Sequence, residues 1–349
     1  MVSAKPRHRI GIIGLGMAVG PHAKSLLDLK DRVEVAYAFS PSAERRRAFG
    51  ERFGFPLADT LDIILWDRSV DTVLILSPPN THLGLVRRAA EAGKHVLLEK
   101  PIDASTENAL EAVRICRALG VTLGIVLQHR FRPAAEKLAS LLKAGELGQV
   151  LGASASMRLW RPQSYYDQPG RGTKERDGGG VLLTQGIHTL DLLLSLSGPA
   201  AQVQSYVTTT PIHRMETEDL VAGAVRYESG AIGTIEATTA AFPGYPERIE
   251  IIGTLGHAAL AGTSLQVAFM DGRTIELAPD ATAGGTGADP MAFPHDYHRA
   301  LISDFLDALD AGKSPRITGE EALKVHFLID ALLESGPAGG PTPVRRIIA

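Results

Sequence analysis

Short apolar runs alternate with helical patterns along the first third of the chain, and this alternation constrains the fold more than any other feature. The runs are RIGIIG, VEVAYAF, DTVLILS, KHVLLEK and VTLGIVL, and helical segments lie between them. Strands that are separated by helices are joined by crossovers, which make the strands parallel and cover both faces of the sheet. The region from Arg9 to about Gln128 therefore predicts a doubly wound parallel sheet of the α/β class.

The pattern changes beyond Arg130. The segment LVAGAVRYESGAIGTIEATT contains two strands that pair across a short turn, which is typical of an antiparallel sheet. We therefore expect two domains, residues 1–129 and residues 130–349, the second an α+β domain with a mostly antiparallel open sheet.

Three helices are predicted in this second region. One lies near residues 134–143, and two amphipathic helices, about residues 295–309 and 319–333, close the chain. The glycine-rich stretch DATAGGTGADP, residues 280–290, is typical of a mobile surface loop.

Composition excludes several classes of partner. Lys and Arg total 36 against 39 for Asp and Glu, a net charge of −3, so no basic surface for nucleic acid is indicated. The chain has neither an export signal nor the run of about 18 apolar residues that a membrane span needs. The single cysteine, Cys116, lies in an apolar context and suits a reducing compartment. We expect a soluble cytoplasmic protein.

A glycine-rich turn follows the first apolar run. In RIGIIGLGMAVGPHA, Gly14 and Gly16 permit a tight turn and let backbone N–H groups approach a pyrophosphate at the start of a helix. The third glycine of the usual pattern is replaced by Val19, with Gly20 one place later. A purely structural turn is the alternative, but its place on the first strand favours a dinucleotide site.

Polar residues follow three further apolar runs, where ligands bind in a doubly wound sheet. In SPPNTH, Asn80 either caps the next helix or bonds a ribose. In EKP, Lys100 is held beside Pro101 and can polarise a hydroxyl or carbonyl oxygen, although a solvated lysine is the alternative. QHRFRP, residues 128–133, is either part of the crevice lining or an anchor of the domain linker.

The stretch GGGVLLTQGIHTLD predicts a buried helix that carries one narrow polar stripe. On an α-helix Gly180, Thr184, His188, Asp191 and Ser195 share a face, while apolar side chains cover most other directions. A lone buried histidine is more often structural, but the stripe and the glycines favour a site. A metal is disfavoured because no third ligand accompanies His188 and Asp191 on this helix.

The start of this helix also favours a ligand. We expect Asp177 to cap the helix, and residues 178–180 to leave space without side chains at its positive end. Such a space suits a hydroxylated or anionic substrate.

Together the segments IGIIGLGMAVGPHA, SPPNTH, AGKHVLLEKP, QHRFRP, DGGGVLLTQGIHTLDLL and GEEALKV resemble the Gfo/Idh/MocA family of NAD(P)-dependent sugar and cyclitol oxidoreductases. The resemblance spans nearly the whole chain. It implies a Rossmann domain, an NADP or NAD cofactor, and a catalytic pair made of Lys100 and His188, in which His188 accepts the hydroxyl proton during oxidation. Many members carry a carboxylate four residues before the histidine, and this chain has Thr184 there.

The resemblance also suggests which residues contact each ligand. Expected cofactor contacts are Gly14, Gly16, Met17, Ala18, Ser40, Arg45, Ser77, Pro79, Asn80, His82, Glu99, Lys100 and Arg130. Expected substrate contacts are Trp160, Arg161, Tyr165, Tyr166, Thr184, Gln185 and His188.

The substrate is indicated only as a class. The segment WRPQSYYDQPGRGTKERDGGG resembles the subgroup that oxidises nucleotide-linked amino-sugar acids, but Gly170 and Lys174 stand where tryptophans are expected. A sugar, cyclitol or similar polyol is the expectation, with a nucleotide-linked sugar as one option. The rival hypothesis is a sensor of the same fold that binds NAD(P) and a sugar without turnover.

The residue at the end of the second strand bears on the cofactor. An NAD site usually has an acidic residue there, whereas this chain has Ser40, followed by Ser42, Arg45 and Arg46, which can bind a 2′-phosphate. An ordinary solvated helix face is the alternative for the arginines. We expect a preference for NADP, and a homodimer or homotetramer that buries the open face of the second sheet.

Overall fold

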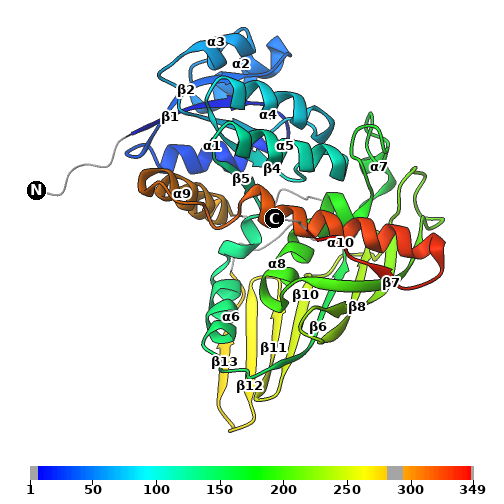
Figure 1. The fold of residues 1–349 in the computed structure, drawn as a ribbon. Coiled ribbons are helices and arrows are strands. Elements are labelled where there is room, and N and C mark those ends of the chain that lie inside the picture. The colour runs from blue at the N-terminus through cyan, green and yellow to red at the C-terminus, as the bar shows by residue number, and fades with distance from the viewer. Residues whose placement is uncertain (1–6, 281–293, 347–349) are drawn as a thin grey trace, which may run out of the picture. The chain divides into compact units, whose positions relative to one another are not determined.

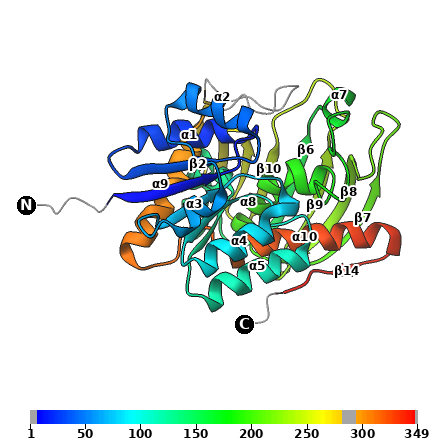
Figure 2. The same ribbon diagram turned by 90° about the horizontal axis from the view of Figure 1, so that it is seen from above.

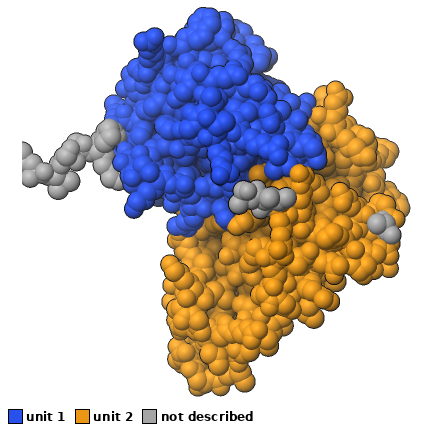
Figure 3. Space-filling model, viewed as in Figure 1, with its two compact units in different colours: residues 1–127, 295–322 blue, residues 128–294, 323–349 orange. Residues whose placement is uncertain are grey.

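The computed structural model describes residues 7–280 and 294–346, which form two compact units. The first unit combines residues 1–127 with 295–322, and the second combines residues 128–294 with 323–349 (Figure 3). From residue 281 on, the stretch that was expected to be a mobile loop lies outside the described residues.

The first unit contains the predicted parallel sheet, with strand order β2-β1-β3-β4-β5 (Figure 1). Its strands are β1 (His8–Ile13), β2 (Val33–Phe39), β3 (Thr72–Ile75), β4 (His95–Glu99) and β5 (Leu123–Val126). Its helical elements are α1 (Val19–Asp28), α2 (Ala43–Phe53), α3 (Leu61–Trp66), η1 (Pro79–Thr81), α4 (His82–Glu91), α5 (Thr106–Ala118) and α9 (Asp296–Ala311). Helix α3 was not predicted.

Helices cover both faces of this sheet. Helix α1 packs against α9, and α4 packs against α5, with the two pairs on opposite sides of the strands (Figure 2). Helix α9 comes from far along the chain, yet its Phe305 ring packs over Gly124 of β5, where a Cβ would lie 2.6 Å from the ring. The N-terminal unit is therefore not one continuous stretch of chain, although a contiguous domain of residues 1–129 was expected.

The second unit is built on a nine-stranded sheet of order β13-β12-β11-β10-β6-β9-β8-β7-β14. The strands are β6 (Val150–Arg158), β7 (Ala200–Thr208), β8 (Leu220–Tyr227), β9 (Ile232–Thr238), β10 (Arg248–Gly253), β11 (Gly256–Ala261), β12 (Ser264–Phe269), β13 (Thr274–Leu277) and β14 (Thr342–Pro343). All described neighbours pair antiparallel except β6 and β9. The predicted mostly antiparallel sheet is confirmed.

Helices cover one face of this sheet. They are η2 (Gln128–Phe131), α6 (Pro133–Lys143), α7 (Gln163–Tyr166), η3 (Leu182–Gly186), α8 (Ile187–Ser197) and most of α10 (Gly319–Ala338). Helix α8 packs on β6 and β10, and α6 packs on β11 and β12. Among the described residues the opposite face carries exposed apolar side chains, including Tyr206, Ile232 and Ile252.

No helix in the described part of the chain is long and apolar enough to cross a membrane.

Candidate functional site

The turn after β1 leaves room for a phosphate. Gly14 has φ +103°, and a Cβ there would lie 2.6 Å from backbone atoms of Leu76 and Ser77, so only glycine fits. A Cβ at Gly16 would meet nothing within 4 Å. No side chain in the described chain caps the start of α1 at Ala18, and apart from the Val19 N–H, which donates to the Gly16 carbonyl at 3.3 Å, the N–H groups of its first turn can bind an anion. This arrangement fits the pyrophosphate of a dinucleotide.

The end of β2 carries the residues that were expected near the ribose. Ser40 is buried, and Arg46 donates to its carbonyl oxygen at 2.7 Å and also pairs with Asp59 at 3.3 Å. Ser42 caps α2 by accepting from the N–H of Arg45 at 3.3 Å. The exposed Arg45 therefore remains the better candidate for a phosphate contact, because Ser42 and Arg46 have local partners.

The segment after β3 is tied to the segment after β4 by His82. This ring is completely buried, with Nε2 2.8 Å from the carbonyl oxygen of Ser77 and Nδ1 3.0 Å from that of Pro101. Burial lowers the pKa of His82. The side chain thus connects two strand ends rather than facing a ligand. Asn80 is exposed in η1 and Asp103 accepts from the first turn of α4, so Asn80 does not cap that helix.

Glu99 lies directly before Lys100 and has two hydrogen bonds. Its Oε1 is 2.8 Å from His22 Nε2, and its Oε2 accepts from the backbone N–H of Lys100 at 3.0 Å. Burial by itself would raise the pKa of Glu99, but the hydrogen bond and charge of His22, with Lys100, outweigh burial and lower it. The carboxylate therefore stays ionised and orients the backbone at Lys100.

His298 of α9 completes this cluster in the first unit. Its ring meets the ring of His22 edge to face, with centroids 4.8 Å apart. Burial lowers the pKa of His298 to about 3. The ligand atoms of His22, Glu99 and His298 lie within 4.8 Å of one another, a composition that a metal ion could use. The direct bond between His22 and Glu99 explains the cluster without an ion, and the expected lack of a metal stays a prediction.

In the second unit, a π-helical turn, η3, precedes α8. Along residues 181–194 every side chain is buried except Thr184, Gln185 and His188. Of the expected polar stripe, Thr184 and His188 are accessible and Ser195 is exposed, whereas Gly180 and Asp191 are buried, and Gln185 is accessible beside them. The π turn shifts Thr184 away from its α-helical position relative to His188, and the Thr184 hydroxyl donates to the Gly180 carbonyl at 2.6 Å.

Asp191 and Arg130 form a buried ion pair. The guanidinium donates to both carboxylate oxygens, at 2.7 and 2.5 Å, and Asp191 is 1% exposed. Of the two alternatives for QHRFRP, this pair favours an anchor, because it ties η2 to α8. The expected contact of Arg130 with the cofactor stays a prediction.

The start of this helix is capped by Glu218, which corrects two expectations. Its carboxylate accepts from the N–H groups of Gly180 and Leu182 at 3.0 and 3.2 Å, whereas Asp177 accepts from Gly172. A Cβ at Gly180 would lie 1.8 Å from the Glu218 carbonyl oxygen. The glycine therefore admits a neighbouring chain segment rather than a substrate, and a carboxylate already occupies the positive helix end.

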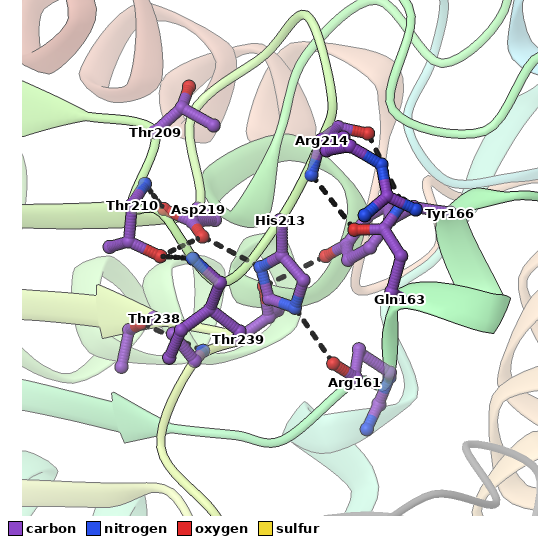
Figure 4. Close-up of polar contacts among 12 residues, drawn as sticks. Arg161, Gln163, Tyr166, Thr209, Thr210, His213, Arg214, Asp219, Thr238 and Thr239 are labelled. Atoms are coloured by element: carbon purple, nitrogen blue, oxygen red, sulfur yellow. Dashed lines mark hydrogen bonds and ion pairs between the residues drawn. The ribbon is translucent and has the colours of Figure 1, made fainter.

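A buried polar cluster supports the segment from Trp160 to Tyr166 (Figure 4). His213 lies 2.7 Å from Asp219 Oδ2 through Nδ1 and 2.8 Å from the Arg161 carbonyl oxygen through Nε2. The Tyr166 hydroxyl bonds that of Thr239 at 2.8 Å, and burial raises the pKa of Tyr166. Tyr166 is therefore buried with its hydroxyl bonded inside the second unit, and its expected substrate contact stays a prediction.

Tyr165 is only partly buried and lies near Gln185. The Gln185 amide donates to the Tyr165 hydroxyl at 3.4 Å, and the guanidinium of Arg171 lies 5.1 Å from the ring centre. Trp160 is also partly buried, whereas Arg161 is 4% exposed and donates to the Trp160 carbonyl. Trp160, Tyr165 and Gln185 therefore remain the accessible candidates for substrate contact in this segment.

Several residues of these clusters were not assigned a role from the sequence. They are His22, His129, His213, Glu218, Asp219 and His298. Two of them stood in quoted motifs, His22 in GPHA and His129 in QHRFRP. The partners of His22, Glu218 and His298 lie far away in sequence, so spacing gave no signal there, whereas His213 and Asp219 are six residues apart and His129 and Arg132 three.

Two family models match this chain, one over the parallel-sheet region and one over part of the second unit. Residues 8–126 match the family model described as "Oxidoreductase family, NAD-binding Rossmann fold", and residues 135–259 match "GFO/IDH/MocA C-terminal domain". The chain is 29% identical to D-xylose 1-dehydrogenase (NADP(+)) 2 of Haloferax volcanii, over 88% of this chain and 90% of that protein. It is 28% identical to myo-inositol 2-dehydrogenase of Thermotoga maritima, over 90% and 91%.

Solved structures give the same result. The WlbA dehydrogenase from Bordetella pertussis, determined with NADH and UDP-GlcNAcA, superposes with a TM-score of 0.84 at 25% identity, covering 97% of this chain and 98% of that one. Levoglucosan dehydrogenase superposes with a TM-score of 0.85 at 22% identity, covering 98% and 100%, which is a likeness of fold.

Proposed function

Because the chain belongs to the Gfo/Idh/MocA family of oxidoreductases, we propose that it transfers a hydride between NAD(P) and a secondary alcohol carbon of a sugar, cyclitol or nucleotide-linked sugar. The observation that carries this proposal is the accessible face of the helix around α8. In a segment that is otherwise buried from residue 181 to residue 194, the side chains left accessible are Thr184, Gln185 and His188. One of them, His188, is the residue that the family resemblance implies to be the acceptor of the hydroxyl proton.

Each proposed residue has a defined task. The bound nicotinamide supplies the hydride acceptor or donor. During oxidation Lys100 donates a hydrogen bond to the substrate oxygen and stabilises its developing negative charge, while His188 accepts the hydroxyl proton. The C–H hydrogen leaves with its electron pair, and the C–O bond becomes a carbonyl. Tyr165 and Gln185 contact the substrate hydroxyl groups.

The test is a spectrophotometric assay with a binding control. Nicotinamide fluorescence reports cofactor binding, and absorbance at 340 nm reports turnover across a panel of sugars, cyclitols and nucleotide-linked sugars. Reduction of the cofactor by any member of the panel supports a dehydrogenase. Cofactor binding without turnover on the whole panel supports the rival, a sensor that binds NAD(P) and a sugar.

We further propose that NADP is preferred over NAD. At the end of β2, Ser40 presents no carboxylate to repel a 2′-phosphate, and the exposed Arg45 has no side-chain partner within residues 7–280 and 294–346. Ser40→Asp should shift the preference toward NAD, and Arg45→Gln should lower kcat/KM for NADP while sparing NAD. The neighbouring Arg47→Gln is the matched control. A wild type that favours NAD by tenfold or more, about 1.4 kcal/mol, contradicts this proposal.

The open face of the nine-stranded sheet supports a homodimer or homotetramer. Tyr206 of β7 is 81% exposed and Ile232 at the start of β9 is 63% exposed, which is unusual for large apolar side chains. Burial of this face against a second copy explains why they are apolar. Light scattering at micromolar protein tests it, and a monomeric mass contradicts it.

A further inference from the structure

The His129 ring lies flat against the ring of His188. The two ring centres are 4.7 Å apart and the planes differ by 25°, which is a stacked arrangement. His129 belongs to η2 and His188 to α8, two elements of the second unit that pack together. The His129 side chain is 14% exposed, so its orientation is set by neighbouring groups.

Arg132 determines the protonation of His129. The guanidinium Nη2 lies 2.7 Å from His129 Nε2, and a guanidinium can only donate hydrogen bonds. His129 Nε2 must therefore be the acceptor, which places the ring proton on Nδ1, at 3.8 Å from Glu247 Oε1. Arg132 also pairs with Glu247, so the guanidinium is fixed between the two side chains. His129 is held as a neutral imidazole.

The charged side chains of α8, of η2 and at the start of η3 are offset by an opposite charge or by backbone N–H groups. On α8 itself Asp191 is neutralised by Arg130 of η2. Strands β6 and β10 present apolar side chains to the helix, including Met157 and Ile251. At the start of η3, Glu218 is bound by backbone N–H groups.

Helix α6 also packs against α8. Helix α6 packs through Ala134, Ala135 and Leu138, and its Glu136 and Lys137 are exposed. Near its N-terminus Arg132 and Glu247 neutralise each other. The ring that stacks on His188 is thus an uncharged imidazole.

We propose that His129 is a positioning residue for His188, an inference that rests on the proposed function. Its stacked ring fixes the plane of the His188 imidazole. Its π face also stabilises the positive charge that His188 gains with the hydroxyl proton. Two stacked imidazoles do not readily hold two protons, and the bond from Arg132 prevents His129 from competing for the proton. In this chain the pair takes over a task for which Thr184 offers no carboxylate.

Two substitutions distinguish the effect of the stacked His129 ring from the effect of its hydrogen bond with Arg132. His129→Gln keeps an acceptor for Arg132 but removes the ring, whereas His129→Phe keeps a stacking ring but removes the acceptor. We expect His129→Gln to lower kcat about tenfold with little change in KM. We also expect it to move the acidic limb of the kcat profile for alcohol oxidation about half a unit to lower pH, because the imidazolium loses its support. His129→Phe should retain at least half of the activity and an unmoved limb.

Controls and outcomes keep the inference separate from the proposed function. His257→Gln makes the same change at a histidine of β11 that lies opposite Ile252 on the proposed oligomer face. Its mass is therefore checked by light scattering first, and at wild-type mass the rate and the profile should be unchanged. Wild-type turnover together with an unaffected His129→Gln overturns the inference and leaves the function intact. Equal damage from the Gln and Phe variants also overturns it.

If the wild type shows no turnover, or if a variant fails to fold, the wild-type protein still provides a test. Histidine ring NMR between pH 5 and 8, assigned with His188→Gln, should show His129 remaining neutral with its proton on Nδ1 while His188 titrates. Protonation of His129 before His188 overturns the proposal.

Discussion

Each unit of the molecule contains a pair of histidine rings in contact, and the pairs differ in geometry and in their charged partner. In the first unit His22 and His298 meet at 84°, both are buried, and the partner of His22 is the carboxylate of Glu99. In the second unit the rings of His129 and His188 are nearly parallel and the partner of His129 is a guanidinium.

The partner decides what each pair can do with a proton. Glu99 binds the His22 ring with one carboxylate oxygen and the Lys100 N–H with the other, so both oxygens are engaged inside the first unit. A guanidinium keeps its imidazole neutral, which leaves the other ring of the stack as the proton acceptor. The first pair is therefore suited to holding the backbone at Lys100, and the second is suited to proton transfer.

Removal of the reacting group should have the largest effect. His188→Ala and Lys100→Met should each lower turnover by about 10² or more while cofactor binding stays largely intact, because each removes a group that acts in the transition state. Steady-state kinetics and nicotinamide fluorescence measure the two quantities. Near-wild-type turnover in either variant would remove that residue from the proposed pair.

Loss of the charge in the first pair should have an intermediate effect. Glu99→Gln leaves His22 without an ionic partner and weakens the bond to the Lys100 N–H, so we expect kcat to fall about tenfold and stability to fall by about 1–3 kcal/mol. The exposed Glu91→Gln on α4 is the matched control. Turnover and urea unfolding should both change; a variant equal to wild type in both would deny Glu99 this role.

The pH dependence of stability should distinguish the buried pair from exposed histidines. Burial lowers the pKa of His298 to about 3, below the ordinary value of 6.5 that applies in the unfolded chain. Between these values the unfolded state binds one more proton, so stability decreases as pH falls from about 6.5 toward 3.

His298→Leu removes the contribution of His298 to the pH dependence of stability. The loss of unfolding free energy between pH 7.5 and pH 5 should shrink by about 1–2 kcal/mol, measured by urea titration at both values. The exposed His257→Leu should leave the loss unchanged. An unchanged loss in His298→Leu would mean that this ring is protonated in the folded protein.

The smallest effect is expected at Thr184. Its hydroxyl donates to a helix carbonyl, so Thr184→Val should change kcat by less than about threefold. Steady-state kinetics of Thr184→Val and His129→Gln, measured under the same conditions, compare the two kcat values. If Thr184→Val lowered kcat as much as His188→Ala does, the Thr184 hydroxyl, and not the stacked His129 ring, would be the group that supports His188.

The sequence predicted those parts of the fold that depend on local periodicity. Alternating apolar runs and helical segments predicted the parallel sheet. The short turn between the segments that form β8 and β9 predicted the antiparallel sheet. The turn at Gly14 was predicted because a left-handed backbone conformation requires glycine. Helices α9 and α10 were also found at the expected places.

Features that depend on distant partners were not predictable in the same way. The α-helical stripe from Gly180 to Ser195 assumed one uniform helix, but η3 inserts a π turn. Asp177 was the nearest acidic residue to the helix start, yet Glu218 reaches it from a different strand connection. His298 follows His22 by almost the whole chain, so no spacing rule could join them.

The path of the chain has a consequence for protein synthesis. The first unit is left at residue 127 and resumed at residue 295, and Phe305 covers Gly124 of β5. At roughly 5–20 residues per second, a ribosome supplies this missing helix on the order of 10 to 35 s after the strand that it covers. The parallel sheet therefore emerges with the part of its apolar surface that α9 covers beside α1 still bare, and nascent chains stalled before residue 295 should be sensitive to protease and attractive to chaperones. Completion of the N-terminal half of the molecule is a late event in translation.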